Sequence, residues 1–424
     1  MTTIDFSNSH MLMVGINYWP EETGNAPYST GLAEHLSSLG ARVTVVAGMP
    51  YYPSWSIAGG YDVRLRSHES RSGVSIHRFR QYIPARQDAV RRIGFETTFL
   101  VNAMTARGIQ SPDLVIGIVP SLSDGVLAAL AAKRYRAPLS LIVQDLVGQA
   151  AAQSGMQGGK RVAAATSRIE GWFARRADSI GIVAEGFRPP LVDMGVAPDR
   201  IHRVRNWTHI EHETLSTQDT RERLGLPLDA RIVLHAGNMG LKQGLENVVD
   251  CARLAMISYP SLVFVLMGDG NQRAVLEVQA AGMSNVRFVE PQDDEMFPNL
   301  LAAADVLLIN QRPSVTDMSL PSKLTSYFST GRPVVAAVAA ASECAREITS
   351  SGGGIVTDPS RPQDMLAAIL ELTTDPARAA CIGQRAKRYA EEMFSSEHAL
   401  ARLSEVIALA ASSVQPKIQE AVAR

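Results

Sequence analysis

The chain has 424 residues, of which 20% are charged and 46% hydrophobic, and its formal net charge is −1 at pH 7. This composition is typical of a soluble globular enzyme and excludes a disordered chain or a strongly basic nucleic-acid-binding protein. The length predicts two or three domains, and no apolar run is long enough to span a membrane. The first ten residues lack the pattern of a secretory signal, so we expect a cytoplasmic protein.

The N-terminal half alternates short apolar runs with helical patterns. Residues 11–16 form the first expected strand, followed by the loop 18–27 and a helix closed by Gly40. Further expected strands, separated mostly by helical segments, cover 43–46, 114–118, 139–143, 179–183 and 201–204. Strand–helix alternation of this kind predicts a parallel sheet.

The same pattern restarts after the polar residues 214–229, which we interpret as a linker with a short helix. Expected strands then follow at 231–235, 262–267, 286–289, 306–309, 334–337 and 354–356. Two consecutive arrays predict an α/β protein with two doubly wound Rossmann-like domains facing each other across a cleft. We expect domains at 1–210 and 211–390, with 391–424 forming a helix that packs back on the first domain and a frayed tail. One large sheet is the alternative, which the polar linker disfavours.

A glycine-rich segment, GNMGLKQGLE (237–246), follows the strand 231–235 and is expected to open a helix. Glycines let backbone N–H groups approach an anion, and a helix N-terminus adds partial positive charge. Lys242 supplies a full charge beside them. The segment therefore predicts a phosphate site, the alternative being an ordinary strand–helix loop with a solvated lysine.

A second segment, SLPSKLTSYFSTGRP (319–333), predicts a helix that Ser319 or Ser322 caps, with Pro321 in its first turn and Gly331 at its end. Lys323 then lies in the first turn, where a cation opposes the helix dipole. A bound anion would account for it; an exposed lysine is the alternative. Two weaker signals are the turn 268–271 after a strand and Gly24 before a helix. Together these loops predict a ligand held mainly by the C-terminal domain.

Six segments resemble the retaining two-domain GT-B glycosyltransferases of glycosyltransferase family 4. They are PEETGNAPYSTGLAEHL (20–36), VQDLVGQAA (143–151), NW (206–207), GNMGLKQGLE (237–246), MGDGN (267–271) and LPSKLTSYFSTGRPVVA (320–336). The chain is most similar to bacterial exopolysaccharide and O-antigen enzymes that transfer fucose or N-acetylfucosamine-type sugars. The resemblance is more specific for fold and reaction than for the sugar.

The resemblance implies a role for each matching residue. Gly24 and Asn25 approach the donor diphosphate, Lys242 neutralises it, and Asn238 stands where many members have arginine. Asp145 lies toward the acceptor and could orient or deprotonate it, although a helix-capping role is equally compatible. The remaining implied donor-binding residues are Asp269 and Gly270 near the nucleotide, Gln292 near the base, and Ser319, Leu320, Pro321, Ser322 and Lys323 near the diphosphate or sugar.

One departure from the family concerns its paired glutamates, Glu-x7-Glu. The second glutamate, which binds the ribose, is replaced by Ser326, and the first by Met318, with Asp317 the nearest carboxylate. No Asp-x-Asp motif or metal-ligand cluster is evident in the sequence, so we expect no cofactor, and lysine must stabilise the leaving diphosphate. A nucleotide-diphosphate sugar, foremost a UDP-sugar, is the expected donor.

Residues 61–107 contain nine arginines and four acids, with an apolar helical cluster nearby that includes Phe95 and Phe99. A basic and apolar surface is typical of peripheral contact with anionic membrane, here the inner face of the plasma membrane. A solvated basic face over a core helix is the alternative; no nucleic-acid motif accompanies it.

These observations predict a metal-independent, retaining transferase that moves a sugar to a saccharide or lipid-linked acceptor in polysaccharide or glycoconjugate biosynthesis. Two alternatives stay open. One is a sugar-nucleotide epimerase or hydrolase of the same fold, and the other is a non-catalytic nucleotide-sugar-binding subunit, which the absent glutamates would allow.

Overall fold

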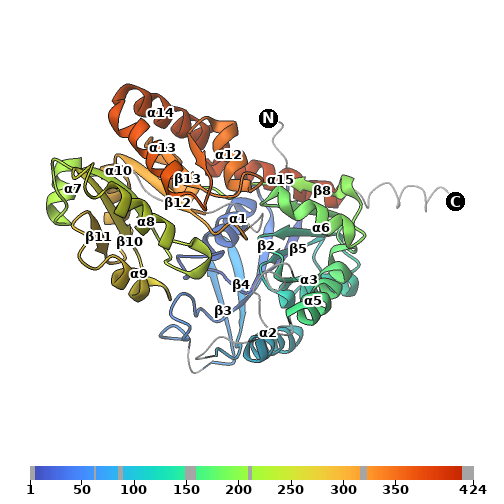
Figure 1. Ribbon diagram of the computed structural model, residues 1–424. Helices are drawn as coiled ribbons and strands as arrows, with labels where there is room; N and C mark the ends of the chain where they lie inside the picture. The colour runs from blue at the N-terminus through green and yellow to red at the C-terminus, as the bar shows by residue number, and fades with distance from the viewer. Residues whose placement is uncertain are drawn as a thin grey trace. The chain divides into compact units, whose positions relative to one another are not determined.

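The computed structural model describes residues 5–61, 64–84, 89–148, 159–208, 213–315 and 322–412 (Figure 1). They form two compact units. The first runs to Asn206 and resumes at Glu397, and the second spans Trp207–Ser396. Each unit contains its own largely parallel sheet with helices in the connections, which confirms the expected α/β class with two Rossmann-like domains.

The sheet of the first unit has the strand order β3-β4-β2-β1-β5-β6-β7-β8, with one antiparallel pair, β3–β4. Its strands are β1 (His10–Val14), β2 (Arg42–Gly48), β3 (Arg66–Arg71), β4 (Val74–Phe79), β5 (Leu114–Val119), β6 (Leu139–Val143), β7 (Ser179–Ile182) and β8 (Ile201–Arg203). Its helices are α1 (Ala26–Ser38), α2 (Ala89–Met104), α3 (Leu122–Tyr135), α5 (Gly159–Ala174), α6 (Arg188–Asp193) and α15 (Ser396–Ser412), with 3₁₀ turns η1 (Glu185–Phe187) and η2 (Pro198–Arg200). The central strands are buried along their whole length because helices cover both faces.

The hairpin β3–β4 is absent from the expected strands. Ser72 and Gly73 join its strands with φ of 49° and 79°, the left-handed pair that a two-residue hairpin turn requires. Arg78 on β4 is fully buried, donating to the Gly48 carbonyl at 3.1 Å and pairing with Glu69. The sequence did not predict this hairpin. Arg78 stands in a run of charged residues, yet its side chain is buried in the structure.

The sheet of the second unit is entirely parallel, in the order β11-β10-β9-β12-β13-β14. Its strands are β9 (Arg231–Ala236), β10 (Leu262–Met267), β11 (Val286–Val289), β12 (Val306–Asn310), β13 (Val334–Ala337) and β14 (Gly354–Thr357). Its helices are α7 (Thr217–Arg223), α8 (Glu246–Ala255), α9 (Arg273–Gln279), α10 (Met296–Ala303), α11 (Ser322–Ser329), α12 (Glu343–Ser351), α13 (Pro362–Thr374) and α14 (Pro376–Met393), with the 3₁₀ turn η3 (Leu241–Gln243).

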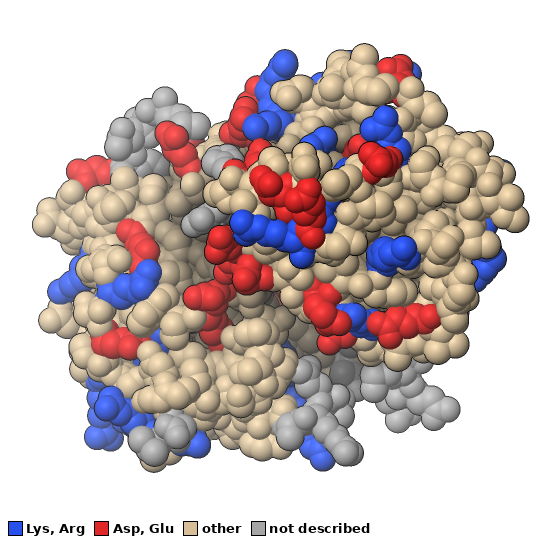
Figure 2. Space-filling model, turned by 90° about the vertical axis from the view of Figure 1, so that its left-hand side faces the viewer, with Lys and Arg blue, Asp and Glu red and all other residues tan. Residues whose placement is uncertain are grey.

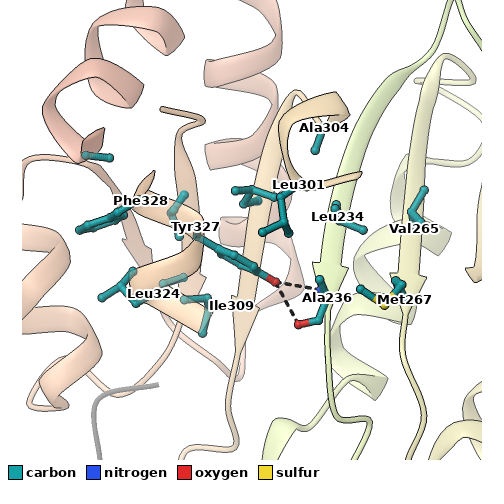
Figure 3. Close-up of a cluster of buried hydrophobic side chains, with 14 of the residues drawn as sticks. Leu234, Ala236, Val265, Met267, Leu301, Ala304, Ile309, Leu324, Tyr327 and Phe328 are labelled. Carbon is teal, nitrogen blue, oxygen red and sulfur yellow. Dashed lines mark hydrogen bonds between the residues drawn. The ribbon is translucent and has the colours of Figure 1, made fainter. Parts of the chain in front are cut away.

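Two hydrophobic clusters enclose this second sheet. Alternate residues of β9 enter different clusters, with Ile232 and Leu234 in one and Val233 in the other, as strand geometry requires. Figure 3 shows part of the first cluster, where Tyr327 of α11 reaches across to the end of β9. Its hydroxyl accepts the Ala236 N–H at 2.8 Å and donates to the Ala236 carbonyl at 3.3 Å. The register of α11 against β9 is thereby fixed.

The C-terminal part of the described chain forms two helices, α14 and α15. Phe394 between them is fully buried, and its carbonyl accepts the N–H of Thr208 at 3.0 Å. A serine, Ser395, directly precedes α15, at a position where serine is favoured. Within the first unit, Arg402 of α15 donates to the Arg203 carbonyl at 3.3 Å.

Charged side chains of both signs are interspersed over the face shown in Figure 2, in keeping with the net charge of −1. No helix in the described part of the chain is long and apolar enough to cross a membrane.

Candidate functional site

The candidate site of the second unit lies where β9, β10 and β12 end. After β9 the chain continues to β10 on one side, whereas β12 pairs with β9 on the other side. Ligands of open parallel sheets bind beside the carboxyl ends of the strands at such a reversal of strand order. The segments that follow these strands, 237–240, 268–272 and 311–315, are therefore the first candidates.

Backbone hydrogen bonds hold the first two of these segments together. The N–H of Gly237 donates to the Met267 carbonyl at 2.8 Å, and that of Met239 donates to the Asp269 carbonyl at 2.8 Å. Gly268 has φ of 129°, and a Cβ atom there would lie 2.1 Å from the Gly237 carbonyl oxygen. Glycine is thus required at position 268 for this close approach of the two loops.

Lys323 lies beside the glycine turn. A Cβ atom on Gly237 would be 2.9 Å from Cε and 3.4 Å from Nζ of Lys323. The Nζ atom is 2.9 Å from Nε2 of His235, a residue of β9 that is 1% exposed. Burial lowers the pKa of Lys323 to about 7. Burial, and secondly the charge of Lys323, lowers the pKa of His235, so a neutral imidazole accepts a hydrogen bond from the lysine.

Lys242 occupies a different setting. The expected helix begins later than the sequence suggested: Lys242 belongs to the 3₁₀ turn η3, and α8 begins only at Glu246. The two are separated by Gly244, whose φ of 56° is left-handed and interrupts the helix. The side chain of Lys242 is exposed, and its carbonyl accepts the N–H of Arg312 at 3.0 Å.

A polar residue at the end of β12 holds this turn in place. The buried amide of Asn310 donates to the carbonyls of Gln243 and Gly244, both at 2.8 Å. Arg312 pairs with Glu246 at 2.7 Å. The turn that carries Lys242 is consequently attached to the same sheet edge as Lys323.

The other predicted donor residues surround these elements in the second unit. Asn238 is exposed, and its Oδ1 would lie 2.6 Å from a Cβ atom on Gly270. Asp269 is exposed and accepts the Gly270 N–H at 2.7 Å, while Gln292 is half-buried and donates to the Glu290 carbonyl at 2.8 Å. Ser326 is half-buried on α11. Ser322 begins α11, whereas Ser319, Leu320 and Pro321 lie outside the described residues.

In the first unit the strand order reverses between β1 and β5. Gly24, with φ of 70°, and Asn25 precede α1, and a Cβ atom on Gly24 would contact the Tyr52 ring at 3.3 Å. Glu21 is buried and accepts the N–H groups of Tyr51 and Tyr52 at 2.8 and 3.0 Å. This carboxylate fixes the loop that follows β2 against the loop that contains Gly24.

A second buried carboxyl at this edge is Asp124 of α3, which is 0% exposed and accepts the N–H of Ile16 at 3.1 Å. Burial, and then the neighbouring Glu96, raises its pKa well above the ordinary value. Glu96 itself accepts hydrogen bonds from the Ser123 backbone at 2.9 Å and hydroxyl at 2.7 Å. Protonated Asp124 could offer a hydrogen-bond donor at the edge where β1 and β5 end.

Asp145 lies just beyond β6, and its Oδ1 accepts the N–H of Leu146 at 2.8 Å. Nearby Glu170 of α5 is 1% exposed and accepts the Gly148 N–H through both oxygens, at 3.3 and 3.2 Å. Burial raises the pKa of Glu170 to about 7, and the charge of Asp145 adds to the shift. The predicted acceptor-side carboxylate therefore has a buried carboxyl neighbour.

Sequence reasoning missed His235, Asp124 and Glu170. His235 carried a usable signal, because it interrupts an otherwise apolar strand, RIVLHA. The two acids occupy helices whose sequences show no comparable anomaly. Among the described residues, no three His, Cys, Asp or Glu side chains gather as metal ligands would.

Comparison with known proteins gives two family matches in sequence order. Residues 23–207 match the glycosyl transferase 4-like domain, and residues 216–389 match the glycosyl transferases group 1 family. The chain is 29% identical over 403 residues to Escherichia coli (strain K12) WcaI, which is named for glycosyl transfer in colanic acid biosynthesis. That match covers 92% of this chain and 97% of WcaI.

Solved structures agree with the two-domain architecture. Anabaena HepE, crystallised with UDP, aligns with a TM-score of 0.67 at 17% identity, covering 94% of this chain and 99% of HepE. Sucrose-phosphate synthase from Thermosynechococcus elongatus aligns with a TM-score of 0.70 at 16% identity, covering 98% of this chain and all, 100%, of the synthase. At these identities the likeness concerns the fold.

Proposed function

The chain is a glycosyltransferase with the GT-B fold, and from this premise we propose that it transfers a sugar from a nucleoside-diphosphate sugar to a saccharide or lipid-linked acceptor. The observation that carries the proposal is the ammonium of Lys323 beside the Gly237 turn, at the sheet edge where parallel α/β domains bind ligands. A diphosphate there would meet a cation, glycine backbone N–H groups and the first turn of α11.

Breaking the bond between the sugar and the diphosphate places negative charge on the leaving group. Catalysis requires that this charge be stabilised more in the transition state than in the ground state. A unit charge at about 4 Å and an effective dielectric of about 20 contributes roughly 4 kcal/mol, whereas a helix terminus contributes about 0.3–1 kcal/mol. We therefore assign the dominant part to Lys323 and Lys242, with no metal ion in the reaction.

We propose that the reaction retains the configuration of the sugar. The acceptor hydroxyl attacks the face from which the diphosphate departs, and a phosphate oxygen takes up its proton, so no protein nucleophile is needed. Asp145 orients the acceptor in this scheme, and its position just beyond the carboxyl end of β6 is compatible with that role.

The names of similar proteins support the choice of substrate class. WcaI is named for colanic acid biosynthesis, a polysaccharide pathway, and HepE was crystallised with UDP and with UDP-glucose. We accordingly propose a UDP-sugar as donor and polysaccharide or glycoconjugate biosynthesis as the process. We propose a fucose or N-acetylfucosamine-type sugar as the transferred group, on the basis of the resemblance described above.

Two measurements test this function against its alternatives. Thermal shift with UDP, GDP, ADP and dTDP should show stabilisation by one of them, and turnover of the matching nucleotide sugar should require an acceptor. Turnover without acceptor would favour an epimerase or hydrolase, and stabilisation without turnover would favour a binding subunit. Stabilisation by none of the nucleotides would contradict the proposal.

We also propose peripheral contact with an anionic membrane through α2. Ile93, Val101 and Met104 lie on one side of this helix and are 65%, 55% and 53% exposed, while Phe95 and Phe99 on the other side are buried. Not every arginine of the region is available, since Arg78 is buried. Flotation with anionic vesicles should recover more protein than flotation with neutral ones; equal recovery would contradict the contact.

A further inference from the structure

The first unit contains an apolar pocket of about 250 Å³ that no step of the proposed transfer uses. Its floor is formed by strands β1 and β2, through Leu12, Val14 and Val46, which are 2%, 1% and 3% exposed. Its walls come from the end of α2, the loop after it and the face of α3. The wall residues are Ala103, Met104, Ala106, Ile109, Leu127, Leu130, Ala131, Arg134 and Tyr135.

The pocket opens at the protein surface. Met104 is 53% exposed and Arg134 is exposed, so the lining passes from fully buried strand residues to solvent-facing residues at the mouth. A dry cavity of about 150 Å³ lined by apolar side chains can hold benzene. This larger pocket therefore offers room for a segment of hydrocarbon chain.

One cation, Arg134, lines the pocket, and further cations belong to or contact the segments that form its walls. Arg134 lines the pocket, with exposed Lys133 and Arg136 next to it in sequence. On the opposite wall, exposed Arg107 follows the lining residue Ala106, and Arg66 donates to Thr105 at 2.7 Å.

A further guanidinium, that of Arg42, donates to Gln110 at 2.5 Å, directly after the lining residue Ile109. In the two wall segments, 103–113 and 127–137, the only acid is Asp113, against the four cations Arg107, Lys133, Arg134 and Arg136. An apolar pocket with Arg134 in its lining and an excess of cations in its wall segments is complementary to an amphiphile with an anionic head.

We propose that this pocket binds the hydrocarbon chain of a phosphorylated lipid, with the phosphate held by Arg134 at the mouth. The chain enters between α2 and α3 and rests on β1 and β2, and Arg134 meets the head group. Exposed Met104 belongs both to the pocket and to the apolar side of α2. A lipid taken from a membrane surface at α2 would therefore reach the pocket without crossing polar surface.

The test is binding of a series of alkyl phosphates to the full chain, measured by calorimetry. The affinity should rise roughly fourfold per methylene from butyl to octyl phosphate, because each added methylene leaves water. Octanol should bind at least about tenfold more weakly than octyl phosphate, since a charge-assisted contact is lost. Binding that does not change with chain length would contradict a hydrocarbon site in the pocket. Equal affinity for octanol and octyl phosphate would contradict a phosphate site at its mouth.

Two substitutions fill the pocket from partly exposed positions, Ala106→Trp and Ala131→Phe. Each should weaken octyl phosphate at least tenfold, whereas Val278→Trp, at a site 77% exposed in the other unit, should not. Arg134→Gln should weaken octyl phosphate but leave octanol unchanged. Unchanged binding in both filling variants would contradict the assignment.

Two controls accompany the filled variants. Stabilisation by UDP should be the same in wild type and filled variants, so loss of the lipid site is distinguishable from failure of the proposed donor site. Sedimentation velocity should show the same oligomeric state in both. A dimer that dissociates on Ala106→Trp would mean that a second copy of the chain occupies the pocket, and would overturn the proposal.

Discussion

The ammonium of Lys323 lies 2.9 Å from Nε2 of His235, although 88 positions separate the two residues in the chain. His235 is the penultimate residue of β9, and Lys323 lies in the first turn of α11. Tyr327, one turn further along α11, is hydrogen-bonded to Ala236, the next residue of β9 (Figure 3). A single helix–strand contact thus places the lysine beside the Gly237 turn.

This relationship predicts a pH dependence of nucleotide binding. The pKa of Lys323 is lowered to about 7 by burial, so the free protein loses this charge as the pH rises through 7. A bound diphosphate favours the charged form, and binding above pH 7 must therefore take up a proton. The dissociation constant of UDP should rise between pH 7 and 9, by up to tenfold per unit.

Calorimetry in buffers of different ionisation enthalpy measures both the affinity and the proton uptake. Lys323→Arg should bind UDP with little pH dependence over the same range, because arginine stays protonated. A wild-type slope retained in Lys323→Arg would assign the titration to another group.

The imidazole of His235 is predicted to position Lys323 rather than to touch the donor. His235→Leu removes the acceptor of the lysine N–H and should raise the KM for the nucleotide sugar several-fold with a smaller change in kcat. His235→Gln can place an oxygen near the Nε2 position and should remain close to wild type. Equal effects of the two substitutions would indicate only a packing role for this strand residue.

Lys242 provides a test of the proposed stabilisation of the leaving diphosphate by an exposed lysine. Lys242→Ala should lower kcat by at least roughly 100-fold, about 3 kcal/mol of transition-state stabilisation. Its side chain is exposed, so the melting temperature should change little. Arg223→Ala, which removes another exposed cation of the second unit, is the matched control. Activity of Lys242→Ala within tenfold of wild type would remove this lysine from the reaction.

The sheet of the second unit could be predicted from sequence because its strands are short apolar runs with helices between them. The ranges 262–267, 286–289 and 334–337 coincide with β10, β11 and β13. The hairpin β3–β4 could not be predicted in the same way, because polar residues interrupt it and no continuous apolar run marks its strands. The burial of Arg78 depends on two partners distant in sequence or strand, Glu69 and the Gly48 carbonyl.

Only those features of the site that depend on neighbouring residues in the sequence could be predicted. Gly237, Gly268 and Lys323 stand in turns or first helical turns that the sequence itself marks. The partner of Lys323 is not marked, because the contact with His235 is created by the pairing of β9 with β12 and by the packing of α11. The same holds for Glu170, whose pKa is raised by burial and by the charge of Asp145, a residue close in space but on another element of the sequence.

Glu170 predicts how stability varies with pH. Its pKa is raised to about 7 in the folded chain, mainly by burial, against an ordinary value of 4.5. Below pH 4.5 the carboxyl is protonated in both states, and its stabilising contribution is lost as the pH rises through 7. Relative to Glu170→Gln, the wild type should lose roughly 3 kcal/mol of unfolding free energy between pH 4.5 and 8.

Denaturant unfolding at several pH values measures this difference directly. The exposed Glu222→Gln is the control and should follow the wild-type profile. A constant difference between the wild type and Glu170→Gln across the range would show that Glu170 has an ordinary pKa in the folded protein.

Gly268 tests whether the backbone contact between the two glycine loops builds the nucleotide site. In Gly268→Ala the new Cβ atom would lie 2.1 Å from the Gly237 carbonyl oxygen, so one of the loops must move. Gly282→Ala is the matched control, because φ at Gly282 is also positive, at 80°, yet no atom lies within 4 Å of its Cβ position. Both variants place an alanine at positive φ, which destabilises the folded chain by about 1–2 kcal/mol.

Only Gly268→Ala should also weaken UDP, by at least tenfold, since the Gly237 turn shifts away from Lys323. Comparing the two variants by calorimetry and thermal unfolding therefore separates backbone strain from the geometry of the site. If both lose the same stability and bind UDP equally well, the close approach of Gly268 to Gly237 serves folding alone, and the nucleotide must be held elsewhere on the sheet edge.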